Sequence, residues 1–338
     1  MVELPRIRVS PEDFQVEEIP AYRPSGEGGH LFLHIEKKNQ TTDAVAGALA
    51  RAAGKARRDI GYAGRKDRNA VTRQWFSIEG VSPESAMAFS LPGAKVLEAI
   101  PHPHKLRTGH LSGNRFRLVV RGVPDGLADQ ARQRFSRILE SGMPNRYGDQ
   151  RYGFESRNVE RGIAILSGQR APRDRRAARF EVSAVQSAVF DLVLRDRPLA
   201  LDALELGDVA RVEESGGLFV VDDVDAACER AGRFEISPTG PIFGTKVIEP
   251  EGEPAERERA AHRTLGIPLP GALQAPRGIR MRGTRRPLRV RPWQARFERR
   301  PDEAIEIDCV LPPGSYATVL IHELVGDFDE FSNGASGD

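Results

Sequence analysis

Strand-like and helix-like segments alternate irregularly along this chain, without the regular strand–helix–strand rhythm of a doubly wound fold. Residues 72–78 and 116–123 have the alternating apolar pattern of strands, whereas residues 42–53 and 126–140 have apolar residues at helical spacing. This order predicts an α+β fold built on a mixed, largely antiparallel sheet. The length of 338 residues indicates two domains, or one core with a large insertion.

The charges are segregated along the chain, although the formal net charge is only +2. Residues 99–124 contain basic residues and no acid, and residues 277–300 contain ten arginines and a single acid, Glu298. Acids without any Lys or Arg follow from Asp302 onward. Segregation of this kind can create a strongly positive surface, so we expect a polyanionic partner such as nucleic acid. The alternative is a compositional bias toward arginine.

The cysteine, histidine and hydropathy patterns indicate the cellular compartment and argue against a metal site or a membrane span. Cys228 and Cys309 lie far apart, which is typical of a reduced compartment. The spacing of His102 and His104 could suit a metal, but no third ligand is near, so we expect no metal site. The first residues lack the regions of a signal peptide, and no apolar run approaches the roughly 20 residues of a membrane span. We therefore expect a cytoplasmic protein that does not act at a membrane.

A glycine-containing loop from Gly61 to Asp67 follows the predicted helix at 42–53. Asp67 stands between Lys66 and Arg68, and nearby cations favour the ionised, nucleophilic form of a carboxylate. The same residues also fit an ordinary surface turn. A phosphate-binding P-loop is a poorer interpretation, because it requires Ser or Thr after the lysine.

Aromatic residues lie near polar or glycine-rich turns and basic stretches. They include Phe14, Phe116, Tyr147, Tyr152 and Tyr316. Aromatic rings beside arginine can stack on unpaired bases, at about 1–3 kcal/mol per base. Each ring, taken alone, fits core packing better.

Six segments in order along the chain resemble the motifs of one family. They are Ile7–Glu18, Gly26–Leu31, Gly61–Phe76, Leu106–Phe116, Pro144–Gly153 and Leu311–Leu324. The family is the TruD pseudouridine synthases. One such match would be weak, but six matches in family order are specific.

The resemblance implies a fold and an activity. It implies a pseudouridine synthase catalytic domain at residues 1–141 and 291–338, interrupted by an inserted α/β TRUD domain at residues 142–290, which contains the segment Pro238–Gly244. It also implies conversion of uridine 13 of certain tRNAs to pseudouridine, with neither cofactor nor metal. The expected partner is tRNA rather than DNA, and a monomer is the default because no coiled-coil heptad is present.

Site residues also follow from the resemblance. Asp67 corresponds to the nucleophile, and the matching substrate-site positions are Phe14, Asn114, Tyr316, Arg8 and Phe116. Tyr316 stands where the family commonly has Phe, and Arg8 stands where Lys is common. Arg8 can still keep the carboxylate ionised, although its planar fork differs from an ammonium group.

The implied mechanism requires the uracil to leave the stacked RNA, at a cost of a few kcal/mol. We expect the basic stretches to hold phosphates, and Phe14, Phe116 and Tyr316 to form a slot for the extruded base. Asn114 offers both a donor and an acceptor. Asp67 could attack ribose C1′ or uracil C6. Two other functions fit less of the sequence: a non-catalytic RNA-binding or RNA-chaperone protein on the same fold, and a carboxylate-dependent hydrolase.

Overall fold

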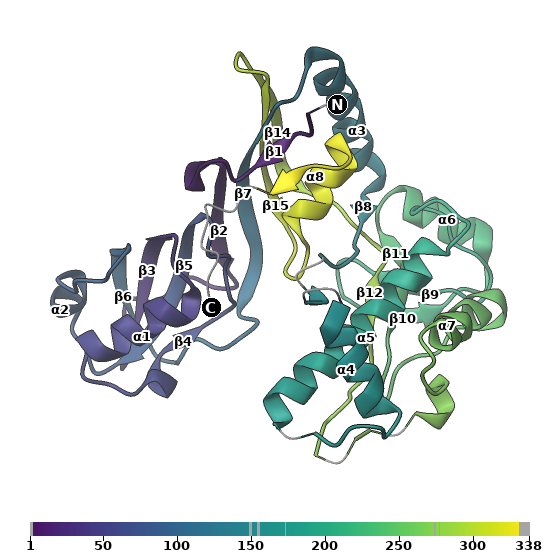
Figure 1. Ribbon diagram of the computed structural model, residues 1–338, viewed down its shortest axis with the longest axis horizontal. Coiled ribbons are helices and arrows are strands. Elements are labelled where there is room, and N and C mark those ends of the chain that lie inside the picture. The colour runs from purple at the N-terminus through teal and green to yellow at the C-terminus, as the bar shows by residue number, and fades with distance from the viewer. Residues whose placement is uncertain are drawn as a thin grey trace. The chain divides into compact units, whose positions relative to one another are not determined.

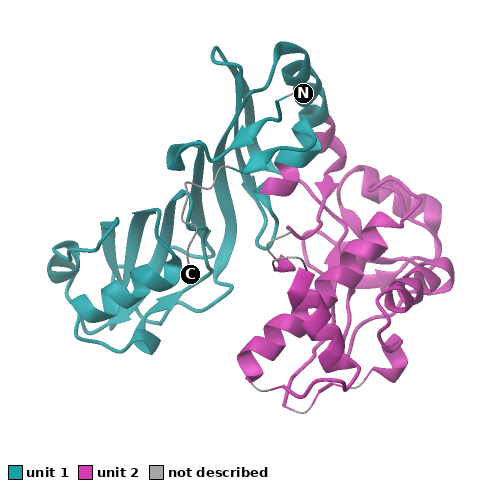
Figure 2. Cartoon of the chain, in the orientation of Figure 1, with its two compact units in different colours: residues 1–136, 292–317, 321–338 teal, residues 137–291, 318–320 magenta. Residues whose placement is uncertain are grey.

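The sheet of the first part of the chain positions most of the predicted site residues. The structure is a computed structural model and describes residues 3–148, 151–153, 156–172, 174–273, 275–276 and 278–330. Within the motif at 144–153, residues 149 and 150 lie outside this description. The chain forms two compact units (Figure 2): Met1–Ser136, Pro292–Ala317 and Ile321–Asp338 form unit 1, and Arg137–Arg291 with Thr318–Leu320 form unit 2.

A ten-stranded sheet forms the core of unit 1 (Figure 1). Its main path runs through β14 (Trp293–Arg300), β15 (Ala304–Leu311), β7 (Leu111–Arg121), β2 (Phe14–Pro20), β5 (Val71–Glu79), β3 (His30–Lys38) and β6 (Ala94–His102). Three short strands join it: β1 (Arg6–Ile7), β16 (Asp329–Glu330) and β4 (Gly61–Tyr62). Along the main path only the β2–β5 pair is parallel. The predicted mixed, largely antiparallel sheet is therefore confirmed.

Helix α1 (Thr42–Ala52) covers one face of this sheet (Figure 1). Its Val45 and Leu49 pack with Ile35 of β3 and Phe76 of β5 in one buried cluster. Thr41 caps the helix by accepting a hydrogen bond from the backbone N–H of Ala44. Thr42 is the first helical residue and is buried, which frees its hydroxyl to support the loop described below. The other helices of unit 1 include α2 (Pro83–Met87) and most of α3 (Asp125–Ser141) and α8 (Ala317–Val325).

Unit 2 has its own sheet and helices. The antiparallel sheet has the order β10 (Leu218–Val220), β9 (Val209–Val212), β11 (Ile236–Ile242) and β12 (Thr284–Pro287). The helices are α4 (Arg157–Leu166), α5 (Arg175–Arg195), α6 (Val224–Gly232) and α7 (Gly252–Thr264). A short antiparallel pair, β8 (Met143–Pro144) with β13 (Arg289–Val290), brings the beginning and the end of the long unit 2 segment side by side.

Helix α5 begins at Arg175, before any regular apolar pattern appears in the sequence. Asp174 caps it by accepting hydrogen bonds from the backbone N–H groups of Arg176 and Ala177. The first turns are rich in exposed arginine, so they have no apolar periodicity from which sequence reasoning could detect a helix.

Candidate active site

The loop that carries Asp67 is held at its beginning by the sheet and by a neighbouring segment. Gly61 and Tyr62 form β4 against β5. A Cβ built on Gly61 would lie 2.4 Å from the Leu106 carbonyl oxygen and from Ser77 Oγ, so only glycine fits there. The backbone N–H of Gly109 donates to the Ala63 carbonyl at 2.8 Å. The loop is therefore a packed element rather than a solvated turn.

Asp67 forms an ion pair with Arg8. Arg8 Nη2 donates to Asp67 Oδ2 at 2.8 Å, and the side chains are 5% and 38% exposed, respectively. Arg8 follows β1 with a φ of 59°, an uncommon left-handed conformation for a residue with a side chain. Its guanidinium lies 4.0 Å from the centroid of the Phe14 ring. A buried cation packed on an aromatic ring thus holds a carboxylate that still reaches solvent.

Lys66 points away from Asp67 into the interior. Its ammonium group lies 2.6 Å from Glu18 Oε2, and the two side chains are 6% and 0% exposed. The backbone N–H of Lys66 donates to Thr42 Oγ1 at 2.9 Å, and that hydroxyl donates to Gln74 Oε1. The neighbouring cations therefore do not surround Asp67 as the sequence suggested, because Lys66 anchors the loop instead.

Lys37 is a second buried cation beneath Asp67. It is 1% exposed, and its ammonium group donates to the carbonyl oxygens of Gln40 and Asp67 at 2.6 and 2.9 Å. No carboxylate forms an ion pair with it within the described residues. Burial lowers the pKa of the Lys37 ammonium to about 8, against an opposing effect of the negative charge on Asp67. The Lys37 ammonium group therefore holds the main chain at Asp67 in place.

Phe14 and Phe116 meet edge to face, with ring centroids 6.2 Å apart at 79°. They are 2% and 7% exposed. Because the Phe14 ring also lies against the Arg8 guanidinium, it contributes to the support of Asp67 in this structure. These contacts bring together four of the predicted site residues: Arg8, Phe14, Asp67 and Phe116.

Asn114 lies two residues before Phe116 on β7, in register with Glu18 of β2 and Leu311 of β15. Its side-chain Oδ1 is buried and accepts no hydrogen bond in the part of the chain that the structure describes. A buried amide oxygen left in this state is costly, and such groups are often found where a ligand supplies the partner. Tyr316, half-buried, precedes α8 on the connection that follows Leu311, the strand partner of Asn114.

Comparisons with known proteins identify the family to which the chain belongs. The family model described as "tRNA pseudouridine synthase D (TruD)" matches residues 5–171 and 174–324. The tRNA pseudouridine synthase D of Geobacter sulfurreducens is 37% identical over 94% of this chain and 92% of that protein. The protein of the same name from an Anaeromyxobacter strain is 42% identical, with the same coverage of each chain. The chain belongs to the TruD family.

A solved structure shows the same fold. The crystal structure titled a putative tRNA pseudouridine synthase D from Methanosarcina mazei superposes with a TM-score of 0.77 at 22% identity, and the match covers 97% of this chain and 94% of that one. The fold expected from the TruD resemblance is therefore confirmed. No helix in the described part of the chain is long and apolar enough to cross a membrane.

The supports of the TruD site were missed by sequence reasoning. Glu18 and Lys37 had no predicted role, although both are charged residues at inward-facing strand positions. Lys37 lies two residues after the buried Ile35 of β3, and Glu18 lies two residues after the buried Val16 of β2. A charge that replaces an apolar residue in this alternation is the signal that could have identified them.

We predicted a positive surface from residues 99–124 and 277–300. That prediction is wrong for most of the basic residues in these stretches. Arg115 and Arg117 of β7 pair with Asp308 and Glu306 of β15 at 2.9 and 2.6 Å. The acidic stretch that follows residue 300 is thus the antiparallel neighbour of the basic stretch, and opposite charges meet across the strands. Arg289, 1% exposed, donates to the carbonyl oxygens of Ser141, Ala231 and Ile236.

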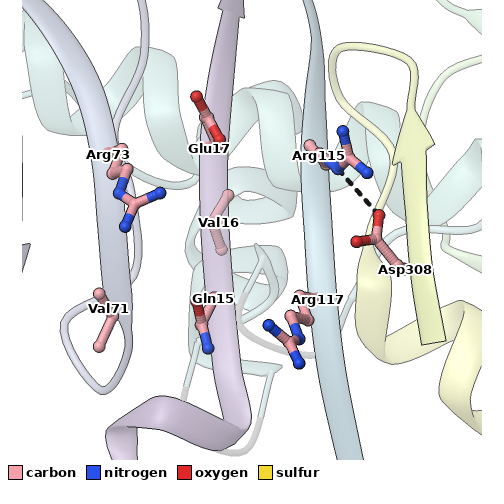
Figure 3. Close-up of a pocket in the computed structure, with 8 residues that line it drawn as sticks. All are labelled: Gln15, Val16, Glu17, Val71, Arg73, Arg115, Arg117 and Asp308. Carbon is pink, nitrogen blue, oxygen red and sulfur yellow. Dashed lines mark hydrogen bonds and ion pairs between the residues drawn. The ribbon is translucent and has the colours of Figure 1, made fainter. Parts of the chain in front are cut away.

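A groove of about 200 Å³ lies on the other face of the sheet of unit 1 (Figure 3). Its lining includes Gln15 and Glu17, which alternate with the site-facing Phe14 and Glu18. Its arginines, such as Arg115, are held by acids. We therefore take the surroundings of Asp67, rather than this groove, as the candidate active site.

Proposed function

We propose that this chain converts uridine to pseudouridine in tRNA, with uridine 13 as the target and Asp67 as the nucleophile. The observation that carries the proposal is the Arg8–Asp67 ion pair, in which the carboxylate is half-buried while its partner is buried. Family membership supplies the reaction class, and the names of the relatives supply the RNA class.

The carboxylate is arranged for attack. Within the described residues, Arg8 donates a hydrogen bond to Oδ2 of Asp67, so Oδ1 is directed to the substrate in our proposal. Asp67 attacks ribose C1′ or uracil C6 of the extruded uridine. The bond from N1 to C1′ breaks and the base turns. C5 then joins C1′, and the bond between Asp67 and the substrate breaks, which restores the free carboxylate. The C5 proton leaves and N1 gains a proton, so that product and substrate are isomers.

The neighbouring residues have separate proposed roles. Asn114 supplies the amide that recognises the uridine, because its Oδ1 is buried without a partner among the described residues. Phe116 and Tyr316 line the slot for the extruded base. Arg8 orients the carboxylate, and Phe14 supports Arg8 from below while closing the same slot.

The domain division belongs to the same proposal. Residues 1–141 and 291–338 would be the catalytic domain, and residues 142–290 the inserted TRUD domain; the separate compactness of Arg137–Arg291 supports this. We propose that the enzyme acts as a cytoplasmic monomer without cofactor or metal, and on RNA rather than DNA.

Mapping the modified nucleotide tests this function. Unmodified tRNA transcripts are incubated with the protein, and pseudouridine is located by carbodiimide treatment and primer extension. We expect one modified position, uridine 13, in those tRNAs that have uridine there. Modification at another position would overturn the target, and binding of tRNA without any modified base would favour the RNA-binding alternative.

A further inference from the structure

The first turns of α5 in unit 2 carry arginines whose charge no acid among the described residues neutralises. Arg175, Arg176 and Arg179 are exposed, and their side chains form no hydrogen bond or ion pair with any residue that the structure describes. Asp174 is the acid next to them in sequence, and its carboxylate is committed to capping the helix. The arginines of β7, in contrast, are paired with acids of β15. The arginines of α5 can therefore bind an anionic ligand, whereas those of β7 are already neutralised.

These arginines stand at the unfavourable end of the helix. The amino-terminal end of a helix carries partial positive charge, which disfavours cations and favours acids. α5 has no acid in its first turn. Three cations at this position, without partners among the described residues, lower the stability of the helix. Features that lower stability in this way are typical of functional surfaces.

An exposed aromatic ring lies beside these cations. Phe180 is 44% exposed, which is unusual for a phenylalanine on a helix of a folded unit. The guanidinium of Arg151 lies 5.4 Å from its ring centroid. Arginine and an open aromatic face are the combination on which unpaired nucleic-acid bases stack.

A second segment adds charge at the same place. A Cβ built on Gly278 would lie 3.1 Å from Arg175 Nε, so the chain at 278–282 runs beside the first turn of α5. Arg280 and Arg282 on this segment are exposed and also form no ion pair within the described residues. The buried Ile279 and Met281 between them belong to the same hydrophobic cluster as Ala178 and Val182 of α5, which fixes the segment in place.

We propose that these residues form an RNA-binding surface of unit 2, which contacts the tRNA outside the reacting nucleotide. This cationic–aromatic patch consists of Arg175, Arg176, Arg179, Phe180, Arg280 and Arg282. The arginines contact phosphates, and Phe180 stacks on an unpaired base. The identity of the RNA as tRNA rests on the proposed function. An acidic protein would match the charges but would give no reason for the open ring.

A charge-matched pair of variants tests the phosphate contacts. The patch variant carries Arg175→Gln, Arg176→Gln and Arg179→Gln. The control carries Arg195→Gln, Arg233→Gln and Arg259→Gln, which remove three exposed arginines of unit 2 that are already paired with acids. We expect the patch variant to raise KM for tRNA about tenfold at unchanged kcat, and to reduce the slope of log K against log salt by about 2–3. The control should change neither quantity.

Two further measurements separate binding from folding. Phe180→Ala should weaken tRNA binding at least about fivefold, whereas Phe180→Tyr, which keeps the ring, should not. The patch variant should melt at the same temperature as the wild type or above it, because removing cations from the helix start relieves repulsion.

Three outcomes would overturn, respectively, the patch, the proposed function and the identity of the ligand. If the wild type forms pseudouridine and the patch variant keeps the KM and the salt slope of the control, the patch is wrong and the proposed function stands. If the wild type binds tRNA but forms no pseudouridine, the proposed function fails, and the patch is then judged by Kd alone. Equal loss of affinity for a poly-glutamate competitor and for tRNA, with no effect of Phe180→Ala, would favour an acidic protein partner.

Discussion

Arg8 Nη2 donates a 2.8 Å hydrogen bond to Asp67 Oδ2, which joins two residues 59 positions apart in the sequence. The arginine is held by its unusual backbone conformation and by the ring of Phe14. The carboxylate is therefore oriented by a side chain that cannot itself move freely. Positioning of this kind is a large part of what an enzyme contributes to a nucleophile.

Replacement of Arg8 should separate charge from shape. Arg8→Lys keeps a cation and should retain activity within about tenfold, whereas Arg8→Met should lower kcat about 100-fold, because a misplaced nucleophile reacts slowly. KM for tRNA should stay within about threefold in both, since Arg8 is buried. Steady-state tritium release measures both parameters. Equal activity of the Met variant and the wild type would show that the ion pair is dispensable.

Lys37 should give activity and stability opposite dependences on pH. Because its pKa is lowered from 10.5 to about 8, the folded protein loses this charge as pH rises through 8. Activity should fall there, since the cation beneath Asp67 is lost. The unfolded chain still holds the proton between pH 8 and 10.5, so stability gained from this group should rise over that window.

The variant Lys37→Met tests that assignment, and Lys38→Met is its control. Lys38 is the next residue, and its side chain is 52% exposed beside Glu12. We expect Lys37→Met to lower kcat at least about tenfold and to remove the decline of kcat/KM above pH 8. Lys38→Met should keep the wild-type profile. A wild-type profile that stays flat to pH 9.5 would contradict the role of Lys37.

Loss of one partner of the buried Lys66–Glu18 pair should destabilise the fold more than expected from the effect of replacing both partners together. Removal of one partner leaves a buried charge, so Lys66→Met and Glu18→Gln should each destabilise the fold by about 3–5 kcal/mol. The double variant should cost clearly less than the sum of the two. Urea denaturation of all four proteins gives this coupling. Additive effects would mean that the two charges do not depend on each other.

Arg289 should act on stability and not on RNA binding. Its removal takes one donor from each of the carbonyl oxygens of Ser141, Ala231 and Ile236. Arg289→Ala should therefore lower the free energy of unfolding by more than about 3 kcal/mol. At a temperature where the variant is folded, its Kd for tRNA should match that of the wild type. A weakened Kd with unchanged stability would restore the phosphate-binding role expected from the sequence.

The loop that carries Asp67 and much of the sheet could be predicted from the sequence because they depend on local signals. The loop at Asp67 has its own motif, and strands such as β5 and β15 show their apolar pattern directly. The strand β2 was not predicted, because its alternation is short and carries the buried charge of Glu18. Its place between β7 and β5 nevertheless brings Glu18 to Lys66.

The electrostatics could not be predicted because they depend on strand register. The basic stretch on β7 and the acidic stretch on β15 are almost 200 residues apart in sequence, and nothing local shows that they are antiparallel neighbours. The same limit hid Lys37, whose partners are carbonyl groups and not a carboxylate. The start of α5 was missed for a different reason: arginines at 175 and 176 stand where an apolar pattern would have indicated a helix.

The most direct test of Asp67 as the nucleophile compares Asp67→Asn with the wild type on tRNA labelled with tritium at uridine C5. Asp125→Asn is the control, because that aspartate is 90% exposed on α3. We expect tritium release by the wild type and the control, and none by Asp67→Asn although it binds tRNA with a similar Kd. Full turnover by Asp67→Asn would contradict the assignment of Asp67 as the nucleophile.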